Sequence, residues 1–221
     1  CVMSAGGEDR FVRDSGVPAE DDWARMEGLC RKRGIVLVED DVRAGFRVNL
    51  AGSHVAYGFT PDLICFGKGI ANGYPISVLM GNDALKQAAT DVFYTGTQFF
   101  NAAPMAAAKA TLLELQRTDA ANRMTATGNK LNAALVGVAG QHGYELVASG
   151  IPAMPYYRLE NVSPQTHSRW IDECVKRGVY VVDFNNHFIS TAHTDRDIER
   201  ICDVAADAFL TLGDPDQYRL R

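Results

Sequence analysis

The chain has 221 residues, of which 47% are hydrophobic and 22% charged, a composition typical of a globular protein long enough to form two domains. A formal net charge of −5 provides no basic field, so we expect neither nucleic acid nor an anionic membrane as a partner. No apolar run reaches the ~20 residues of a membrane span and no signal-peptide pattern opens the chain, so we predict a cytoplasmic protein. The five cysteines are scattered without metal-binding spacing, which favours reduced thiols and no metal site.

The first half of the chain reads as one helix followed by buried strands. Apolar residues at helical spacing predict a helix over 21–33, with Gly34 as its stop. Apolar runs of strand length follow at 35–39, 62–66 and 76–80. Because near-continuous apolar strands are typical of sheets covered on both faces, we expect an α/β fold with a mostly parallel sheet.

From about residue 110 the pattern changes to helices and a small α+β unit, so we place a packing boundary there. Further elements are predicted as a helix opening at Pro104, a helix over 123–141, a helix starting at Ser163-Pro164 and ending at Gly178, a strand over 179–184, and a final helix with a capping box at Thr194–Asp197. We find no internal repeat and no linker.

An acidic run and a lysine share the same structural context. Glu39, Asp40 and Asp41 end one predicted strand, and Lys68 follows the next within "FGKGIANGYP". Ligands gather at the carboxyl ends of strands in open α/β sheets, so these groups are expected to face one crevice. A lysine shielded from water there would have its charged form disfavoured, as addition to a carbonyl requires. Taken alone, Gly-Lys-Gly is common in surface loops, and the stretch lacks the serine or threonine of a Walker loop.

Four motifs in order carry a family resemblance. They are "VEDDVRAGFR" (38–47), "PDLICFGKGIANGYP" (61–75), "YTGTQFFNAAPMAAAKATL" (94–112) and "FISTAHTDRDIE" (188–199). Together they resemble the late signatures of class III aminotransferases, which depend on pyridoxal 5′-phosphate (PLP), and the last is most similar to the glutamate-1-semialdehyde aminomutase branch. The resemblance implies a fold-type-I transferase. Residues 1–110 would be the C-terminal part of the PLP-binding large domain, and 111–221 the small C-terminal domain.

The same resemblance implies a role for each matching residue. Asp40 would contact the pyridine nitrogen and keep it protonated, which makes the ring an electron sink. Lys68 would form the Schiff base with the cofactor aldehyde and then move a proton between substrate and cofactor. Val42 would pack on the ring, with a plain core valine as the open alternative. Gly96 and Thr97 would bind the cofactor phosphate, usually from the neighbouring subunit of a dimer.

Some positions depart from the family pattern. The usual Asp-Glu pair is Asp40-Asp41 here, and Phe99 and Phe100 stand where small residues commonly let substrate pass. The carboxylate-binding arginine of the ornithine-type branch has no match in "DFNNHFISTAH" (183–193). We interpret the histidines of that stretch, His187 and His193, as structural.

The predicted function is transfer of an amino group between an amine or amino acid and a carbonyl compound. Alternatives are a PLP-dependent aminomutase, epimerase or decarboxylase, and a non-catalytic partner subunit. The family's earlier half, which supplies the phosphate cup and the stacking aromatic, has no counterpart here. We therefore expect it as a separate chain or a missing segment, within a homodimer or a heteromeric assembly. The sequence names neither the substrate nor its stereochemistry.

Overall fold

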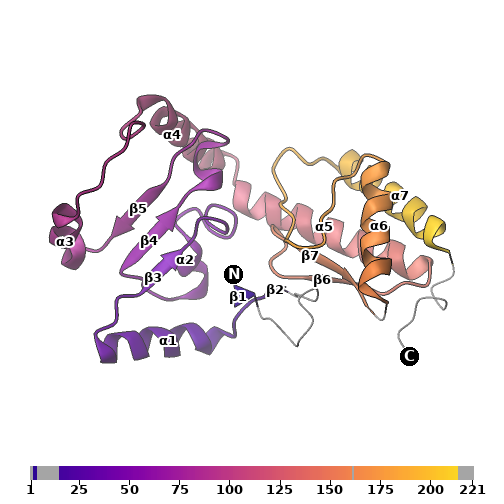
Figure 1. Ribbon diagram of the computed structural model, residues 1–221, viewed down its shortest axis with the longest axis horizontal. Helices are drawn as coiled ribbons and strands as arrows, with labels where there is room; N and C mark the ends of the chain where they lie inside the picture. The colour runs from indigo at the N-terminus through magenta and orange to yellow at the C-terminus, as the bar shows by residue number, and fades with distance from the viewer. Residues whose placement is uncertain (1, 4–14, 161, 214–221) are drawn as a thin grey trace. The chain divides into compact units, whose positions relative to one another are not determined.

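The computed structural model describes residues 2–3, 15–160 and 162–213, which form two compact units (Figure 1). The N-terminal unit comprises residues 18–122, and the C-terminal unit comprises residues 123–213 together with the short strands β1 (Val2–Met3) and β2 (Ser15–Gly16). The division between the two units falls at Asn122, and helix α4 (Ala102–Arg117) lies within the N-terminal unit.

The N-terminal unit is built on a three-stranded sheet in the order β3-β4-β5 (Figure 1). Strands β3 (Val38–Asp40) and β4 (Leu63–Phe66) are parallel, as predicted, whereas β5 (Val78–Gly81) runs antiparallel to β4. The first strand is shorter than predicted, since it begins at Val38 and the Ile35 amide donates to the Cys30 carbonyl of α1 at 2.9 Å instead of to a strand.

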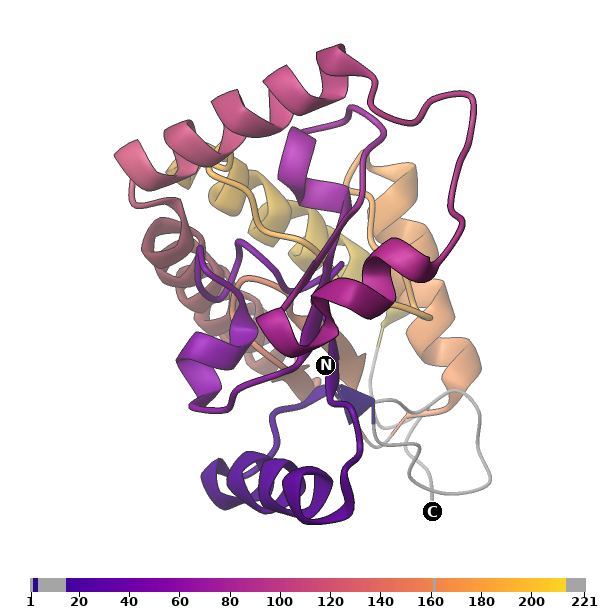
Figure 2. The same cartoon turned by 90° about the vertical axis from the view of Figure 1, so that its left-hand side faces the viewer.

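Short and long helices complete this unit. They are α1 (Glu20–Arg33), α2 (Ser53–Tyr57), α3 (Lys86–Asp91), α4, and the 3₁₀ turns η1 (Lys68–Ala71) and η2 (Asp83–Leu85). Gly34 ends α1 in the left-handed conformation (φ 63°), as predicted. Ile70 and Ala71 of η1 pack with Phe46, Phe66 and Ala108 in one buried cluster, which sets α4 alongside η1 (Figure 2).

Helix α1 is attached to the rest of the N-terminal unit by polar contacts and by aromatic stacking. Arg31 donates to the carboxylate of Asp62 and to the carbonyl of Thr60, each at 2.6 Å. Trp23 stacks on Phe59 with ring centroids 4.6 Å apart. By contrast, Leu29 is 55% exposed. The Arg31 contacts lie at the C-terminal end of α1, and their partners Thr60 and Asp62 directly precede β4.

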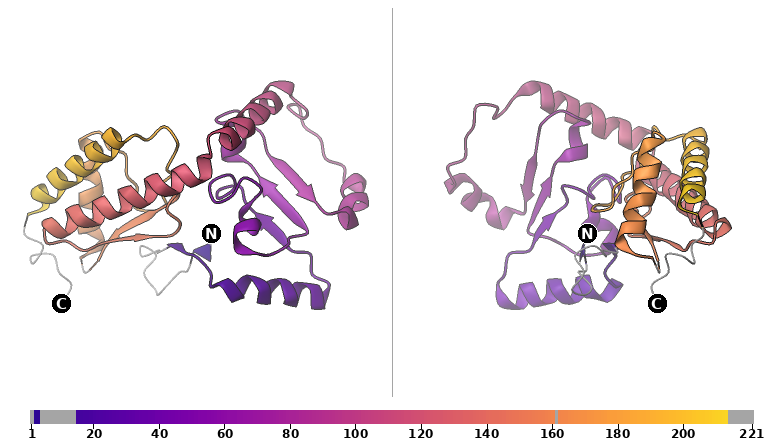
Figure 3. Two further views of the ribbon diagram at one scale, coloured as in Figure 1. Left: turned by 180° about the vertical axis from the view of Figure 1, so that it is seen from behind. Right: turned by 45° about the vertical axis from the view of Figure 1, so that its right-hand side comes forward.

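The C-terminal unit combines three helices with a β-hairpin (Figure 3). The helices are α5 (Ala120–Gln141), α6 (Pro164–Lys176) and α7 (Asp195–Leu212), and the antiparallel strands are β6 (Leu146–Ser149) and β7 (Tyr156–Leu159). Helices α6 and α7 run side by side. Two predicted caps are confirmed: the Ser163 hydroxyl accepts from the Thr166 amide at 3.1 Å, and Thr194 with Asp197 forms the capping box.

One predicted strand in this unit is wrong. Residues 179–184 are irregular, because the Val182 amide donates to Nε2 of His187 at 3.1 Å and not to a strand. The hairpin over 146–159 was not predicted, since its strands are short and lack a clear alternation of apolar and polar residues. Within the described part of the chain, no helix has both the length and the apolar character needed to cross a bilayer.

A close backbone approach in this unit yields a stability prediction. A Cβ added at Gly128 in α5 would lie 1.9 Å from the carbonyl oxygen of Pro152, whereas one at Gly137 in the same helix meets nothing within 4 Å. We expect Gly128→Ala to lower the free energy of unfolding by about 3 kcal/mol or more, and Gly137→Ala to raise it by up to about 1 kcal/mol. Denaturant unfolding of both variants checks this, and equal midpoints would contradict the close approach.

Candidate functional site

Pairing of β3 with β4 brings the acidic run and the lysine turn to one edge of the sheet. Asp40 lies opposite Cys65 in the parallel register, and the Asp41 amide donates to the Cys65 carbonyl at 3.0 Å. Lys68 follows three residues after Cys65, at the first position of η1. Both groups therefore sit beyond the carboxyl ends of parallel strands, where ligands bind in α/β sheets.

Asp40, Val42 and the lysine turn are linked by direct contacts. The exposed side chain of Asp40 accepts the Val42 amide through Oδ1 at 3.2 Å. Val42 in turn packs against Gly67, where an added Cβ would lie 3.3 Å from Cγ1 of the valine. Three of the five predicted site residues, Asp40, Val42 and Lys68, are thus neighbours at this edge.

The backbone of Lys68 is strained. Its φ of 41° is in the left-handed region, which a residue with a long side chain rarely adopts and which tends to occur at functional positions. The following glycines leave open space, since a Cβ at Gly69 or Gly73 would meet nothing within 4 Å. The expectation of a shielded lysine is wrong for this chain by itself, because η1 buries Ile70 and Ala71 and leaves Lys68 exposed.

Behind Asp40, two buried carboxylates bind a short helix. Oε1 of Glu39 accepts the His54 amide at 2.8 Å, and Oδ2 of Asp41 accepts the Ser53 amide at 2.8 Å. The Ser53 hydroxyl adds a bond to Oδ1 of Asp41 at 2.7 Å. Oε2 of Glu39 lies 2.8 Å from Nδ1 of His54.

Burial raises the pKa of Glu39, and the nearby charge of Asp41 raises that pKa further, while the His54 contacts oppose the shift. Sequence reasoning missed Ser53 and His54, because nothing in their own sequence surroundings marks them. The available signal was the period of two in the acidic run, which places Glu39 and Asp41 on one face and Asp40 on the other.

Gly96 and Thr97 lie elsewhere in the N-terminal unit. Both are exposed, on the segment that leads from α3 to α4 (Figure 1). That segment carries an exposed aromatic group, in which Phe99 stacks edge-on against Tyr94 and Phe100. The structure does not bring Gly96 and Thr97 into the group formed by Asp40, Val42 and Lys68.

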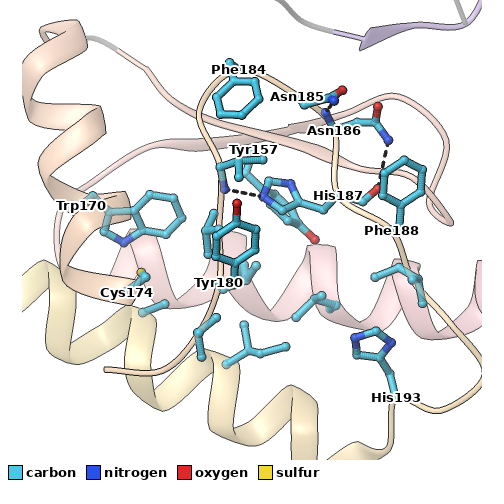
Figure 4. A pocket seen from close by; sticks show the side chains of 18 residues that line it. Tyr157, Trp170, Cys174, Tyr180, Phe184, Asn185, Asn186, His187, Phe188 and His193 are labelled. Atoms are coloured by element: carbon cyan, nitrogen blue, oxygen red, sulfur yellow. Dashed lines mark hydrogen bonds between the residues drawn. The ribbon is translucent and has the colours of Figure 1, made fainter. Parts of the chain in front are cut away.

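The C-terminal unit contains a separate cavity of about 440 Å³ (Figure 4). Its lining is mainly apolar and aromatic, and includes Trp170, Tyr157 and Phe184. His187 lies at its side, where Nε2 accepts the Val182 amide and Nδ1 lies 3.3 Å from the Pro155 carbonyl. A neutral imidazole satisfies both contacts, which agrees with a structural histidine.

A second histidine, His167 in α6, is buried beside the hairpin. Its Nδ1 accepts the Leu159 amide at 3.5 Å, and its Nε2 is buried without a partner. Burial lowers the pKa of His167 to about 4 and also lowers the pKa of His187. Both imidazoles are therefore held neutral by the fold.

The sequence that forms the edge with Asp40 and Lys68 also matches a known protein family. The family model described as Aminotransferase class-III matches residues 15–207. The chain belongs to the class-III aminotransferase family. The match runs through both units and includes the edge that carries Asp40 and Lys68.

Individual relatives of this class-III chain give the same picture. Aminopentol aminotransferase from Sphingopyxis macrogoltabida is 41% identical over 181 residues, covering 81% of this chain and 43% of the relative. The 3-aminobutyryl-CoA aminotransferase of Cloacimonas acidaminovorans is 31% identical over 175 residues, covering 77% and 42%. Among solved structures, the FumI protein of Sphingopyxis sp. MTA144, in its PLP internal aldimine form, superposes with a TM-score of 0.88 at 36% identity, covering 94% of this chain and 50% of that one. The chain thus spans about half the length of its relatives.

The buried histidines give this class-III chain a predictable acid response. A histidine whose pKa is lower in the folded than in the unfolded state contributes stability above the unfolded value, near 6.5, which is lost as pH falls toward the folded value. We expect His167 to account for a loss of about 3 kcal/mol between pH 6.5 and 4. Denaturant unfolding across this range should show a shallower loss in His167→Gln.

The matched control is His142→Gln, which removes a histidine from the same unit. An unchanged pH dependence in His167→Gln would contradict the prediction.

Proposed function

We propose that this chain is the lysine-bearing half of a PLP-dependent aminotransferase that moves an amino group between an amine donor and a carbonyl acceptor. The observation that carries the proposal is the parallel β3–β4 register, which gives one edge of the sheet both the Asp40 carboxylate and the Lys68 amine. Membership in the class-III family supports the same reaction.

The residues at this edge fit a flat cofactor that carries an aldehyde and a basic ring nitrogen. An exposed amine and an exposed carboxylate lie beside glycine backbone with open space at Gly69 and Gly73. When bound, PLP supplies an electron sink for the carbanion that forms when the substrate loses its proton. The strained φ of Lys68 agrees with a residue placed for chemistry.

Each residue has a distinct task in this proposal. The Asp40 carboxylate would hold a proton on the ring nitrogen, and Val42 would pack on one face of the ring. The Lys68 amine would hold the cofactor covalently and, once the substrate amine has displaced it, would move a proton between the substrate carbon and the cofactor. The Gly96 amide and Thr97 hydroxyl donate to the phosphate from a neighbouring subunit, which suits their position on an exposed segment.

The remaining half of the site is proposed to come from residues outside this sequence. Because the chain spans about half of its relatives, we propose that a separate chain or a further segment supplies the rest, in a homodimer or heteromeric assembly. Residues 1–110 would belong to the cofactor-binding large domain and 111–221 to the small domain. A cytoplasmic location remains a prediction from the sequence.

The names of the relatives suggest which substrate to test first. The 41% identical relative is named for an aminopentol and the 31% identical relative for 3-aminobutyryl-CoA. Both are aminotransferases, which favours transfer over isomerisation or decarboxylation. Similarity to the glutamate-1-semialdehyde aminomutase branch rests on residues 188–199 alone. We therefore propose an amino alcohol of the aminopentol type as the first donor to assay.

Covalent trapping tests the role of Lys68. The assembled enzyme is incubated with PLP, reduced with borohydride and digested, and the modified peptide is mapped by mass spectrometry. We expect the label on Lys68, no label in Lys68→Ala, and unchanged labelling in Lys86→Ala, which removes another exposed lysine of the same unit. A label on any other residue would overturn the assignment.

A product assay tests the reaction class. If the enzyme transfers amino groups, conversion of the amine will require a carbonyl acceptor and each turnover will consume one. Steady conversion without an acceptor would instead indicate an aminomutase, epimerase or decarboxylase. Full activity of Lys68→Ala in the assembled enzyme would favour a non-catalytic role for this chain.

A further inference from the structure

The residues on either side of Asp40 are clamped to the same short helix. Glu39 and Asp41 are 8% and 2% exposed, and they accept the consecutive amides of His54 and Ser53 at the start of α2, each at 2.8 Å. Bonds to charged acceptors are stronger than neutral ones, and a buried amide left without a partner is costly. The end of β3 is therefore fastened at two points that flank the exposed Asp40.

Because successive side chains of a strand point to opposite faces, the two anchored carboxylates also determine where Asp40 points. Glu39 in β3 and Asp41 directly after the strand are both buried, so the exposed Asp40 between them projects to the opposite side. Rotating β3 to re-aim Asp40 would withdraw both flanking carboxylates from the α2 amides at once. Asp41 is also held by its own backbone, since its amide donates to the Cys65 carbonyl at 3.0 Å and its carbonyl accepts the Gly45 amide at 2.9 Å.

The chain also makes room for this arrangement. Gly52 precedes α2 with φ 119°, and a Cβ there would lie 2.7 Å from Nδ1 of His54. The glycine lets the His54 ring lie over the end of β3, where Nδ1 is 2.8 Å from Oε2 of Glu39. The acidic run, the glycine and α2 thus form one local unit.

We propose that Glu39, Asp41, Ser53 and His54 form a polar anchor that sets the direction of the Asp40 carboxylate toward the cofactor ring. These are positioning residues that act through Asp40. The inference rests on the proposed function, because it presumes that Asp40 faces the ring nitrogen of PLP.

The test compares cofactor affinity with fold stability in the assembled enzyme. Glu39→Leu fills a similar volume but leaves the His54 amide without an acceptor, whereas Glu39→Gln keeps a carbonyl oxygen for it. We expect Glu39→Leu to weaken PLP binding by about tenfold, the lower end of what losing an outer hydrogen bond costs at metal sites. Glu39→Gln should bind PLP within about twofold of the unsubstituted enzyme.

Asp62→Leu is the matched control. Asp62 is also a buried carboxylate that accepts a backbone amide, that of Leu37 at 2.8 Å, but it lies before the start of β4. We expect this variant to lower the melting temperature of the PLP-free protein while leaving the dissociation constant of PLP within about twofold. Ser53→Ala, which removes only the hydroxyl bond to Asp41, provides a milder second test, with an expected loss of PLP affinity smaller than that of Glu39→Leu.

The outcomes separate this inference from the proposed function. If the unsubstituted enzyme binds PLP and Glu39→Leu and Ser53→Ala bind it with the same affinity, the polar anchor is overturned while the proposed function stands. Equal weakening of PLP binding in Asp62→Leu also overturns the anchor, because the effect would then come from general destabilisation. Weakened PLP binding in Glu39→Gln overturns it as well, because the effect would then come from loss of the charge. No PLP binding by the unsubstituted enzyme overturns both.

Discussion

The parallel pairing of β3 with β4 is the constraint on which the site depends. Two strands that run in the same direction end at the same edge, so residues far apart in sequence become neighbours there. With Asp40 opposite Cys65, the acidic run ends beside the turn that begins at Gly67. Val42, which follows the acidic run, packs closely on Gly67, which begins the lysine turn, and this contact holds the two segments together. The antiparallel β5 adds a third strand without changing this edge.

Local signals in the sequence predicted the longer helices, whereas the short α2 and α3 were not predicted. Gly34, Ser163 and the capping box of Thr194 with Asp197 act within one turn of chain, so their effect can be recognised without the rest of the fold. Pairing of strands depends on partners distant in sequence. The run at 179–184 was therefore misassigned, since its backbone bonds a histidine ring in place of a strand.

The same distinction applies to the candidate site. Asp40 and Lys68 could be proposed from strand ends and motif order, and the register places them at one edge. Ser53 and His54 could not, because their contribution is made by backbone amides, which every residue type provides. The exposure of Lys68 also could not be foreseen, because burial is a property of packed surroundings and not of the glycines beside the lysine.

The attachment of α1 has a consequence for motion. Its hold on the unit combines the bonds from Arg31 to Asp62 and Thr60 with the stacking of Trp23 on Phe59, while Leu29 contributes little burial. Ion pairs near a surface weaken as salt concentration rises, whereas packed apolar cores do not. Amide hydrogens of α1 should accordingly exchange with solvent sooner in concentrated salt than those of α4, whose buried residues pack on η1. The two helices would then open as separate cooperative segments of one unit.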